Sequence, residues 1–465
     1  MALIAYLMLL AGCTAYASLD WRRGWYLLLA CGVLQDPVRK LTPGTPVTIS
    51  FSIILIYAMI LFTARKEMAA ALTDFSRRFA NLYSATFILI LTLAIAAMNG
   101  LVTYGVDNWK VPMLGLFTYL APLPAIILGY TWLQREEQLY QLYRVYAAIT
   151  SIALIGTILE YFRVRSPVLG LVAQPGVDYI RYFSGMEVRL LSGFYRSPDI
   201  MGWHAATLTA IAITMALRSG VRKQVLIWMS VSAWAFLTCL IAGRRKATYF
   251  VVVYAAVVLW RYFRRVQNAQ VFSLAGVMLI LWTVMHHIAA GQQSSAYARA
   301  AAASQDEITH RLEGGAWATF QQYGFLGAGL GTATQGAQHV LKGSTEQLGW
   351  QEGGLGKLAI EVGLPGLLAI AFVAWLLLAM LMRLTKIPDV PGSSQLGRVS
   401  LFGLFLANAA TFTASAQAYT DAVLSLFTAF LIGCLFATAA LDERLPAAEK
   451  SDAAQPQQLT APATA

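Results

Sequence analysis

Long apolar runs separated by short polar segments dominate the pattern along the chain. Most runs are about 16–25 residues long, the length that a helix needs to cross roughly 30 Å of hydrocarbon. They predict twelve or thirteen membrane-spanning helices, at residues 2–18, 25–34, 47–64, 81–98, 113–133, 145–162, 201–217, 225–242, 247–260, 271–288, 355–382, 399–418 and 422–440. Between them we expect a turn-rich link at 35–46 and polar segments at 64–78, 135–144 and 163–200.

Composition points the same way. The 465 residues are 58% hydrophobic and only 12% charged, whereas a soluble protein carries about 25% charged residues. The sequence therefore predicts an all-α polytopic membrane protein. The net charge of +11 fits the Lys and Arg that collect in cytoplasmic loops, and no aromatic-interleaved basic patch favours nucleic acid. The four cysteines lie in apolar runs without the spacing of metal ligands or a redox pair.

The basic loops orient the second half of the chain. Residues 218–223 and 261–265 are both basic and are separated by two spans, so both should be cytoplasmic. The segments 163–200, 243–246 and 291–354 then lie outside. The domain organisation that follows is an N-terminal transmembrane bundle at 1–290, a large periplasmic loop at 291–354, C-terminal transmembrane helices at 355–440 and a disordered cytoplasmic tail at 441–465.

A cationic turn at 243–246, Gly-Arg-Arg-Lys, stands on the outer side, against the usual orientation bias. It is either a solvated or interfacial anchor or part of an anion site. Arginine stays charged and holds phosphate oxygens through a planar fork. An outer arginine cluster therefore predicts a phosphate or diphosphate ligand, such as a lipid-linked diphosphate. The arginines that we place outside are Arg163, Arg165, Arg181, Arg189, Arg196, Arg244, Arg245, Arg299 and Arg311.

Other polar residues lie near the same side. The glycine run at 324–331 lacks the strand and lysine of a nucleotide-binding loop, so it more simply permits a tight turn or a close approach to a ligand. Glu361 falls early in a span, where a carboxylate needs a partner, and the outer arginines are the candidates. His204, in the first turn of another span, is either an interfacial histidine bonded to a neighbour or a substrate contact.

In this order, the motifs resemble those of the O-antigen ligase and O-antigen polymerase superfamily of bacterial envelope glycosyltransferases, over roughly residues 80–440. The resemblance rests on four elements, which are the stretch from Arg189 to Gly202, the turn Arg245-Lys246-Ala247, the series Arg311, Trp317 and Gly327-Ala328-Gly329, and the stretch from Glu361 to Gly366.

The resemblance implies a GT-C-like, metal-independent membrane enzyme without a cofactor. Such an enzyme transfers glycan from an undecaprenyl-diphosphate carrier to a sugar hydroxyl of an acceptor glycan or lipid-linked glycan. It acts at the periplasmic face of the bacterial inner membrane, in O-antigen or exopolysaccharide polymerisation or ligation. Membrane lipid is the other expected partner, and nucleic acid is not one. The alternative is a lipid-linked oligosaccharide flippase or another transporter.

The resemblance also assigns roles to residues. Glu352 stands where the family usually has a loop histidine, and it is our candidate general base, with His339 and His310 as alternatives. Arg245 and Arg311 complete the predicted catalytic set. The predicted substrate-binding residues are Arg189, Arg196, Arg244, His204, His339 and Glu361.

Overall fold

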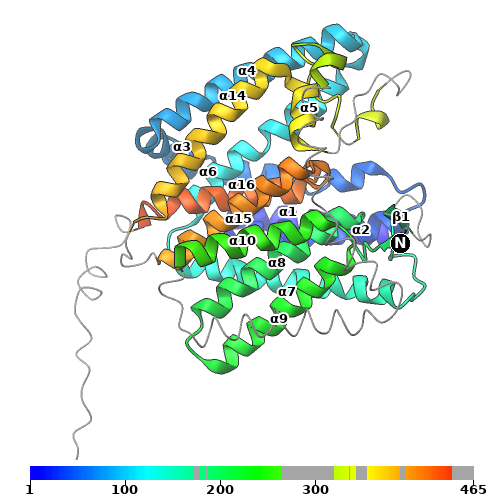
Figure 1. Cartoon of the computed structure of the whole chain (residues 1–465), viewed down its shortest axis with the longest axis vertical. Helices are drawn as coiled ribbons and strands as arrows, with labels where there is room; N and C mark the ends of the chain where they lie inside the picture. Colours follow the sequence, from blue (N-terminus) through cyan, green and yellow to red (C-terminus); the bar gives the residue numbers. More distant parts are fainter. Residues whose placement is uncertain are drawn as a thin grey trace, which may run out of the picture.

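The structure is a computed structural model that describes residues 1–171, 179–183, 186–262, 319–334, 336–341, 353–387 and 394–441. This part of the chain is almost entirely helical (Figure 1). Its helices are α1 (Ala2–Leu19), α2 (Trp21–Leu41), α3 (Ile54–Arg78), α4 (Ala80–Tyr104), α5 (Lys110–Leu120), α6 (Pro122–Trp132), α7 (Glu136–Tyr161), α8 (Pro198–Arg218), α9 (Arg222–Ile241), α10 (Arg245–Tyr262), α14 (Gly354–Leu384), α15 (Gln395–Ala414) and α16 (Ala422–Ala437).

Short elements complete the described chain. The antiparallel strands β1 (Tyr179–Phe183) and β2 (Met186–Leu190) form a hairpin, in which Ile180 is paired with Arg189. The 3₁₀ turns are η1 (Val47–Phe51), η2 (Val106–Asn108), η4 (Ala337–His339) and η6 (Gln417–Thr420).

Nine helical segments of the described chain are long and apolar enough to cross a bilayer. They confirm the prediction of an all-α, multi-pass membrane protein. Three further helices, α2, α10 and α16, lie where the hydrophobic pattern predicts additional spans. The span predicted at 271–288 lies outside the described residues.

Several boundaries differ from the prediction. Helix α2 continues past Pro37 to Leu41, through much of the predicted link, and α3 continues through the charged segment to Arg78. Helix α7 begins at Glu136, within the segment predicted to be a polar loop. Hydropathy marks only the part of a helix that suits lipid, whereas Ala, Glu, Lys, Arg and Gln all continue a helix into the polar region. The β1–β2 hairpin was also missed, although β1 contains Ile180 and three aromatic residues and β2 contains Val188, all of high strand propensity.

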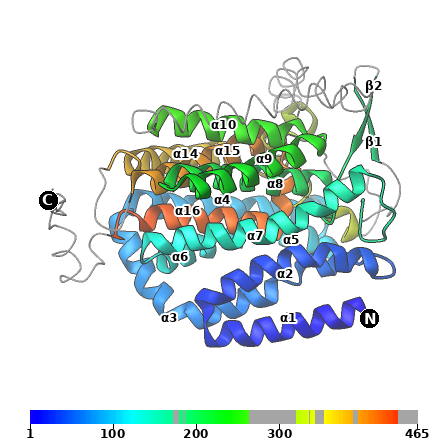
Figure 2. The same ribbon diagram turned by 90° about the horizontal axis from the view of Figure 1, so that it is seen from below.

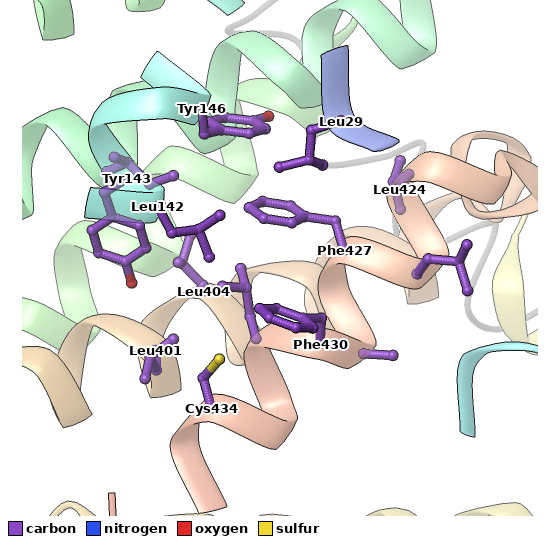
Figure 3. Close-up of a cluster of buried hydrophobic side chains, with 14 of the residues drawn as sticks. Leu29, Leu142, Tyr143, Tyr146, Leu401, Leu404, Leu424, Phe427, Phe430 and Cys434 are labelled. Carbon is purple, nitrogen blue, oxygen red and sulfur yellow. The ribbon is translucent and has the colours of Figure 1, made fainter. Parts of the chain in front are cut away.

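The main bundle packs around α8, whose residues are buried from Pro198 to Ala216. Helices α7, α9, α10 and α15 contact α8, and α16 contacts α6 and α15. An apolar layer that includes Leu142 of α7, Leu404 of α15 and Phe427 of α16 fills the bundle (Figure 3). The Phe427 ring stacks on that of Tyr146 with 4.8 Å between the ring centroids.

Helices α4, α5 and α14 form a second unit, which we call the side unit together with residues 324–334. It has its own apolar cluster, which includes Leu93 of α4, Leu330, and Leu358 and Val362 of α14. Helices α4 and α14 lie side by side along one flank of the bundle (Figure 1). The C-terminal helices are therefore distributed among the N-terminal ones, because α14 packs on α4 while α15 packs on α10 and α16 on α6.

Candidate functional site

One end of the molecule carries the β1–β2 hairpin and the first turns of α8 and α10, and we call it the hairpin end (Figure 2). Two cations at the start of α10 meet one carboxylate there. Arg244 lies 3.0 Å from Asp199 of α8, and Lys246 forms an ion pair with the other oxygen of the same side chain. Lys246 also donates a 2.6 Å hydrogen bond to Ser415 and contacts Gln417. We call Arg244, Arg245 and Lys246 the cation cluster.

Local sequence explains why these groups meet. Ser197 caps α8 and Pro198 occupies its first turn, which places Asp199 in that same turn. Gly243 has a φ of +69° and turns the chain sharply between α9 and α10. Gly202 lets α10 approach closely, since a Cβ at this position would lie 3.1 Å from the Ala247 methyl. The cation cluster is thus held near Asp199 by the close packing of α8 and α10.

Arg196 lies between two carboxylates from distant parts of the chain. Its guanidinium is 3.4 Å from Asp36 of α2 and 2.5 Å from Asp421, which caps α16. Its backbone N–H donates to Asp36 as well, at 3.0 Å. Burial opposes the charge, but the two carboxylates outweigh burial and raise the pKa of Arg196. Arg196 therefore joins α2 to α16 as a charged clamp.

The segment that presents Arg196 is held from both sides. The ammonium of Lys40 donates to the carbonyls of Val168, Gly193 and Tyr195, at 3.2, 2.8 and 2.7 Å. Glu160 accepts from the backbone N–H groups of residues 192 and 193, at 3.0 and 2.6 Å. Sequence reasoning missed Asp36, Lys40 and Glu160. These three charged residues lie near the ends of apolar runs, where an unpaired charge is costly. That position was the signal that each of them needs a partner.

The predicted arginines of the hairpin also lie at this end. Arg189 is half-buried on β2 and interacts electrostatically with Glu160. The Arg244 guanidinium lies 5.9 Å from the ring centre of Tyr179, on β1. The structure thus brings Arg189, Arg196, Arg244 and Arg245 to one end of the bundle, as the sequence predicts.

His204 lies deeper than a ligand contact at the surface would. Its side chain is buried, its Nδ1 is 2.9 Å from the hydroxyl of Tyr146, and its ring stacks on Tyr195 with 4.8 Å between centroids. Of the two interpretations of His204, the observed contacts agree with a histidine bonded to its neighbours.

Glu361 has partners other than the expected arginines. Its carboxylate accepts from the Tyr119 hydroxyl, from Thr334 Oγ1 at 2.7 Å and from the Ala333 N–H at 3.2 Å. The only cation near it in the described chain is Lys357, at 4.0 Å. No arginine of the described chain pairs with Glu361, because the cation cluster lies on α10 of the main bundle whereas α14 belongs to the side unit. Arg299 and Arg311 lie outside the described residues, so for them the expectation stays a prediction.

The glycine run packs against helices of the protein itself. Gly327, Gly329 and Gly331 all have positive φ, and a Cβ on any of them would collide with the backbone of α14, α4 or α5. Helix α14 is interrupted at Gly363, with φ 62° and ψ −169°. The backbone groups near this interruption bond to the run: Ala328 N–H donates to Ile360 at 2.7 Å, and Leu364 N–H donates to Phe325 at 2.9 Å. The glycines allow close approach, as expected, but they approach helix backbone.

Four of the predicted catalytic residues and alternatives receive little or no description. His339 ends the 3₁₀ turn η4, after the glycine run. Glu352, Arg311 and His310 lie outside the described residues. The predicted base and one of the predicted catalytic arginines therefore stay predictions.

A groove lies at the boundary between the side unit and the main bundle. It is lined by Phe117 and Thr118 of α5, by Thr334, and by Tyr419, Thr420 and Ser425 of η6 and α16. Two of its lining residues adjoin the charged groups. Thr334 donates to Glu361, and Thr420 precedes Asp421, which pairs with Arg196.

In comparisons with known proteins, no family model and no curated protein sequence matches this chain. Among the described residues, no group of three or more His, Cys, Asp or Glu side chains is placed to hold a metal ion. Fold and site together define a multi-pass helical membrane protein with a cationic site at one end of its bundle.

Proposed function

We propose that the protein is a membrane glycosyltransferase, which transfers glycan from a lipid-linked diphosphate, of the undecaprenyl type, to a sugar hydroxyl. The single observation that carries the proposal is the gathering of Arg189, Arg244, Arg245 and Lys246 at the hairpin end. A diphosphate head group at this height would keep its lipid chain in the bilayer. The order of motifs that resembles the O-antigen ligase and polymerase superfamily supports the same reaction.

The chemistry requires stabilisation of the leaving group. When the bond between the anomeric carbon and the diphosphate breaks, negative charge grows on the phosphate oxygens, and preorganised cations lower the barrier. Arg244 and Lys246 are held by Asp199, so they do not have to reorganise as charge develops. A base takes the proton of the attacking hydroxyl; Glu352 is our candidate. Attack opposite the leaving group inverts the anomeric configuration.

The interior of the main bundle favours a transferase over a flippase. Two buried polar groups occur at different depths: Tyr146 with His204, and a hydroxyl cluster of Tyr143, Thr214 and Ser400. His204 and Thr214 are about 15 Å apart along α8, at 1.5 Å per residue. The apolar layer of Leu142, Leu404 and Phe427 fills the bundle next to them (Figure 3). A flippase needs a polar lining at this depth to carry a polar head group across the bilayer. An apolar layer does not provide such a lining, so the interior favours the transferase.

The proposal includes a location. The basic residues of 218–223 and 261–265 favour a cytoplasmic location for those segments. The hairpin end then faces the periplasm of a bacterial inner membrane.

Replacement of one residue of the cation cluster tests the proposal. Arg245→Ala should abolish polymer or ligated glycan in cells while the protein remains in the membrane at its normal level. The matched control is Arg222→Ala, at the first residue of α9, on the other side of the bundle. Glycan formation by Arg245→Ala at the level of the control would contradict the diphosphate site.

A deletion strain separates the two functions. Loss of a transferase leaves lipid-linked glycan at the periplasmic face, whereas loss of a flippase leaves it at the cytoplasmic face. Accumulation at the cytoplasmic face would favour the flippase and overturn the proposal.

A further inference from the structure

Lys357 is a buried cation that has no role in the reaction proposed above. Its side chain is only 5% exposed, in the first turn of α14. The ammonium lies 4.0 Å from the nearer Glu361 oxygen and 5.5 Å from the ring centre of Tyr119. No hydrogen bond from this ammonium to the described residues occurs. An ammonium that is withdrawn from water without hydrogen-bond acceptors is strongly disfavoured.

Glu361 does not satisfy this ammonium. Its oxygens are bonded by the Tyr119 hydroxyl, by Thr334 Oγ1 and by the Ala333 N–H. Those bonds fix the carboxylate toward α5 and the segment after the glycine run. At 4.0 Å the lysine gains an electrostatic partner from it but no hydrogen bond. Within the described chain, the donors of the ammonium are therefore left for another acceptor.

Lys357 lies three residues after the point where α14 contacts a segment that also contacts the cation cluster. The start of α14 packs on the end of α15, where a Cβ on Gly354 would collide with the Phe412 carbonyl. Just beyond this contact, Ser415 accepts the 2.6 Å hydrogen bond of Lys246. The segment 412–417 is therefore contacted by the start of α14 from the side unit and by Lys246 from the main bundle. The groove between the two units is lined by Tyr419 and Thr420, immediately after this segment.

We propose that Lys357 binds a phosphate group of the same anionic ligand that the cation cluster binds, so that the ligand bridges the main bundle and the side unit. This inference rests on the proposed function, since it assigns a second contact to the same diphosphate. Phosphate oxygens supply the hydrogen-bond acceptors that the ammonium lacks, and Lys is a common phosphate ligand as a point charge. Bound ligand then links α14 to α10 across the segment 412–417.

The test is a calorimetric titration of the full-length protein in detergent with inorganic diphosphate. We expect Lys357→Met to weaken binding at least about tenfold, the factor that corresponds to 1.4 kcal/mol. Lys357→Arg should recover most of the affinity, because it restores a cation with several donors. Lys357→Met also leaves the buried Glu361 carboxylate without a nearby cation, so its melting temperature should fall, and Lys357→Arg should restore both the melting temperature and the binding.

Each other outcome has a distinct meaning. If Lys246→Met loses affinity and Lys357→Met binds like the wild type, the ligand stays on the cation cluster, and the inference fails while the proposed function stands. If the wild type binds no diphosphate, the proposed function fails as well. A lower melting temperature and weaker binding in Lys357→Met, without rescue by Lys357→Arg, would make Lys357 a structural residue and overturn the inference.

A second probe identifies the source of the phosphate. Undecaprenyl diphosphate in the same detergent should bind more tightly than inorganic diphosphate, and Lys357→Met should weaken both. Binding of the lipid no tighter than that of inorganic diphosphate would overturn a lipid-borne ligand.

Discussion

The main bundle and the side unit hold their charged groups in different ways. At the hairpin end of the bundle, Arg196, Arg244 and Lys246 pair with carboxylates of other elements. In the side unit, hydroxyl and backbone N–H groups hold Glu361, and the nearby Lys357 has no hydrogen bond within the described chain. The first arrangement fixes cations in place, and the second fixes a carboxylate and leaves a cation available. Carboxylates therefore hold the cations of the main bundle in place, whereas the Lys357 ammonium of the side unit has hydrogen-bond donors left for a ligand.

The largest effect on stability is expected from breaking the Arg196 clamp. Arg196→Met leaves Asp36 and Asp421 buried and close together without a cation between them. Loss of one partner of a buried pair costs about 3–5 kcal/mol. Thermal unfolding in detergent should show a large fall in melting temperature.

An exposed pair provides the control for the clamp. Arg23 lies 3.3 Å from Asp20, and its side chain is 70% exposed. Arg23→Met should therefore leave the melting temperature nearly unchanged. Equal melting temperatures for Arg196→Met and Arg23→Met would show that the clamp does not stabilise the bundle.

A smaller effect is expected where the glycine run docks on α14. Gly363 has φ 62° and ψ −169°, a conformation that is essentially restricted to glycine. Gly363→Ala strains this backbone by about 1–3 kcal/mol and pushes a methyl group into the backbone of Leu326. Unfolding measurements should show this loss, together with faster proteolysis of the segment around 324–334.

Gly12 of α1 is the matched control, because a Cβ there meets nothing within 4 Å. Gly12→Ala should stabilise the helix by up to about 1 kcal/mol. If Gly363→Ala were as stable as Gly12→Ala, the interruption of α14 would not be a docking point for the glycine run.

The smallest effect is expected from single groups around Glu361. Tyr119→Phe removes one hydrogen bond to this buried carboxylate and should cost about 0.5–1.5 kcal/mol. Glu361→Gln keeps an acceptor for Thr334 but removes the charge beside Lys357, and should cost about 1–3 kcal/mol. Chemical unfolding of both variants checks the order, and a larger loss for Tyr119→Phe would contradict it.

Hydropathy predicts much of this fold but little of the pairing within it. The apolar runs predict the spans because lipid selects for them locally, residue by residue. The partners of a charge are set by packing between helices, so Lys40 with the Gly193 carbonyl, or Asp199 with Arg244, has no local signal. Clustering of the arginines at one end was predictable, because the basic loops orient the spans in the second half of the chain.

Glu361 shows the limit of the same reasoning. Its depth in an apolar run predicts correctly that it needs a partner. Which partner it finds depends on the packing of α14 against α4 and on the hydrogen bond from Tyr119 of α5. The glycine run is similar, since its backbone freedom was evident from the residues while the helix that it approaches was not.

The central claim is that the cation cluster binds a lipid-linked diphosphate and promotes transfer from it. The most direct measurement is the release of undecaprenyl diphosphate by the purified full-length protein, given an undecaprenyl-diphosphate-linked glycan and an acceptor glycan. The account predicts acceptor-dependent release by the wild type and by Arg222→Ala, and its loss in Arg245→Ala. Release by Arg245→Ala at the wild-type rate would contradict it.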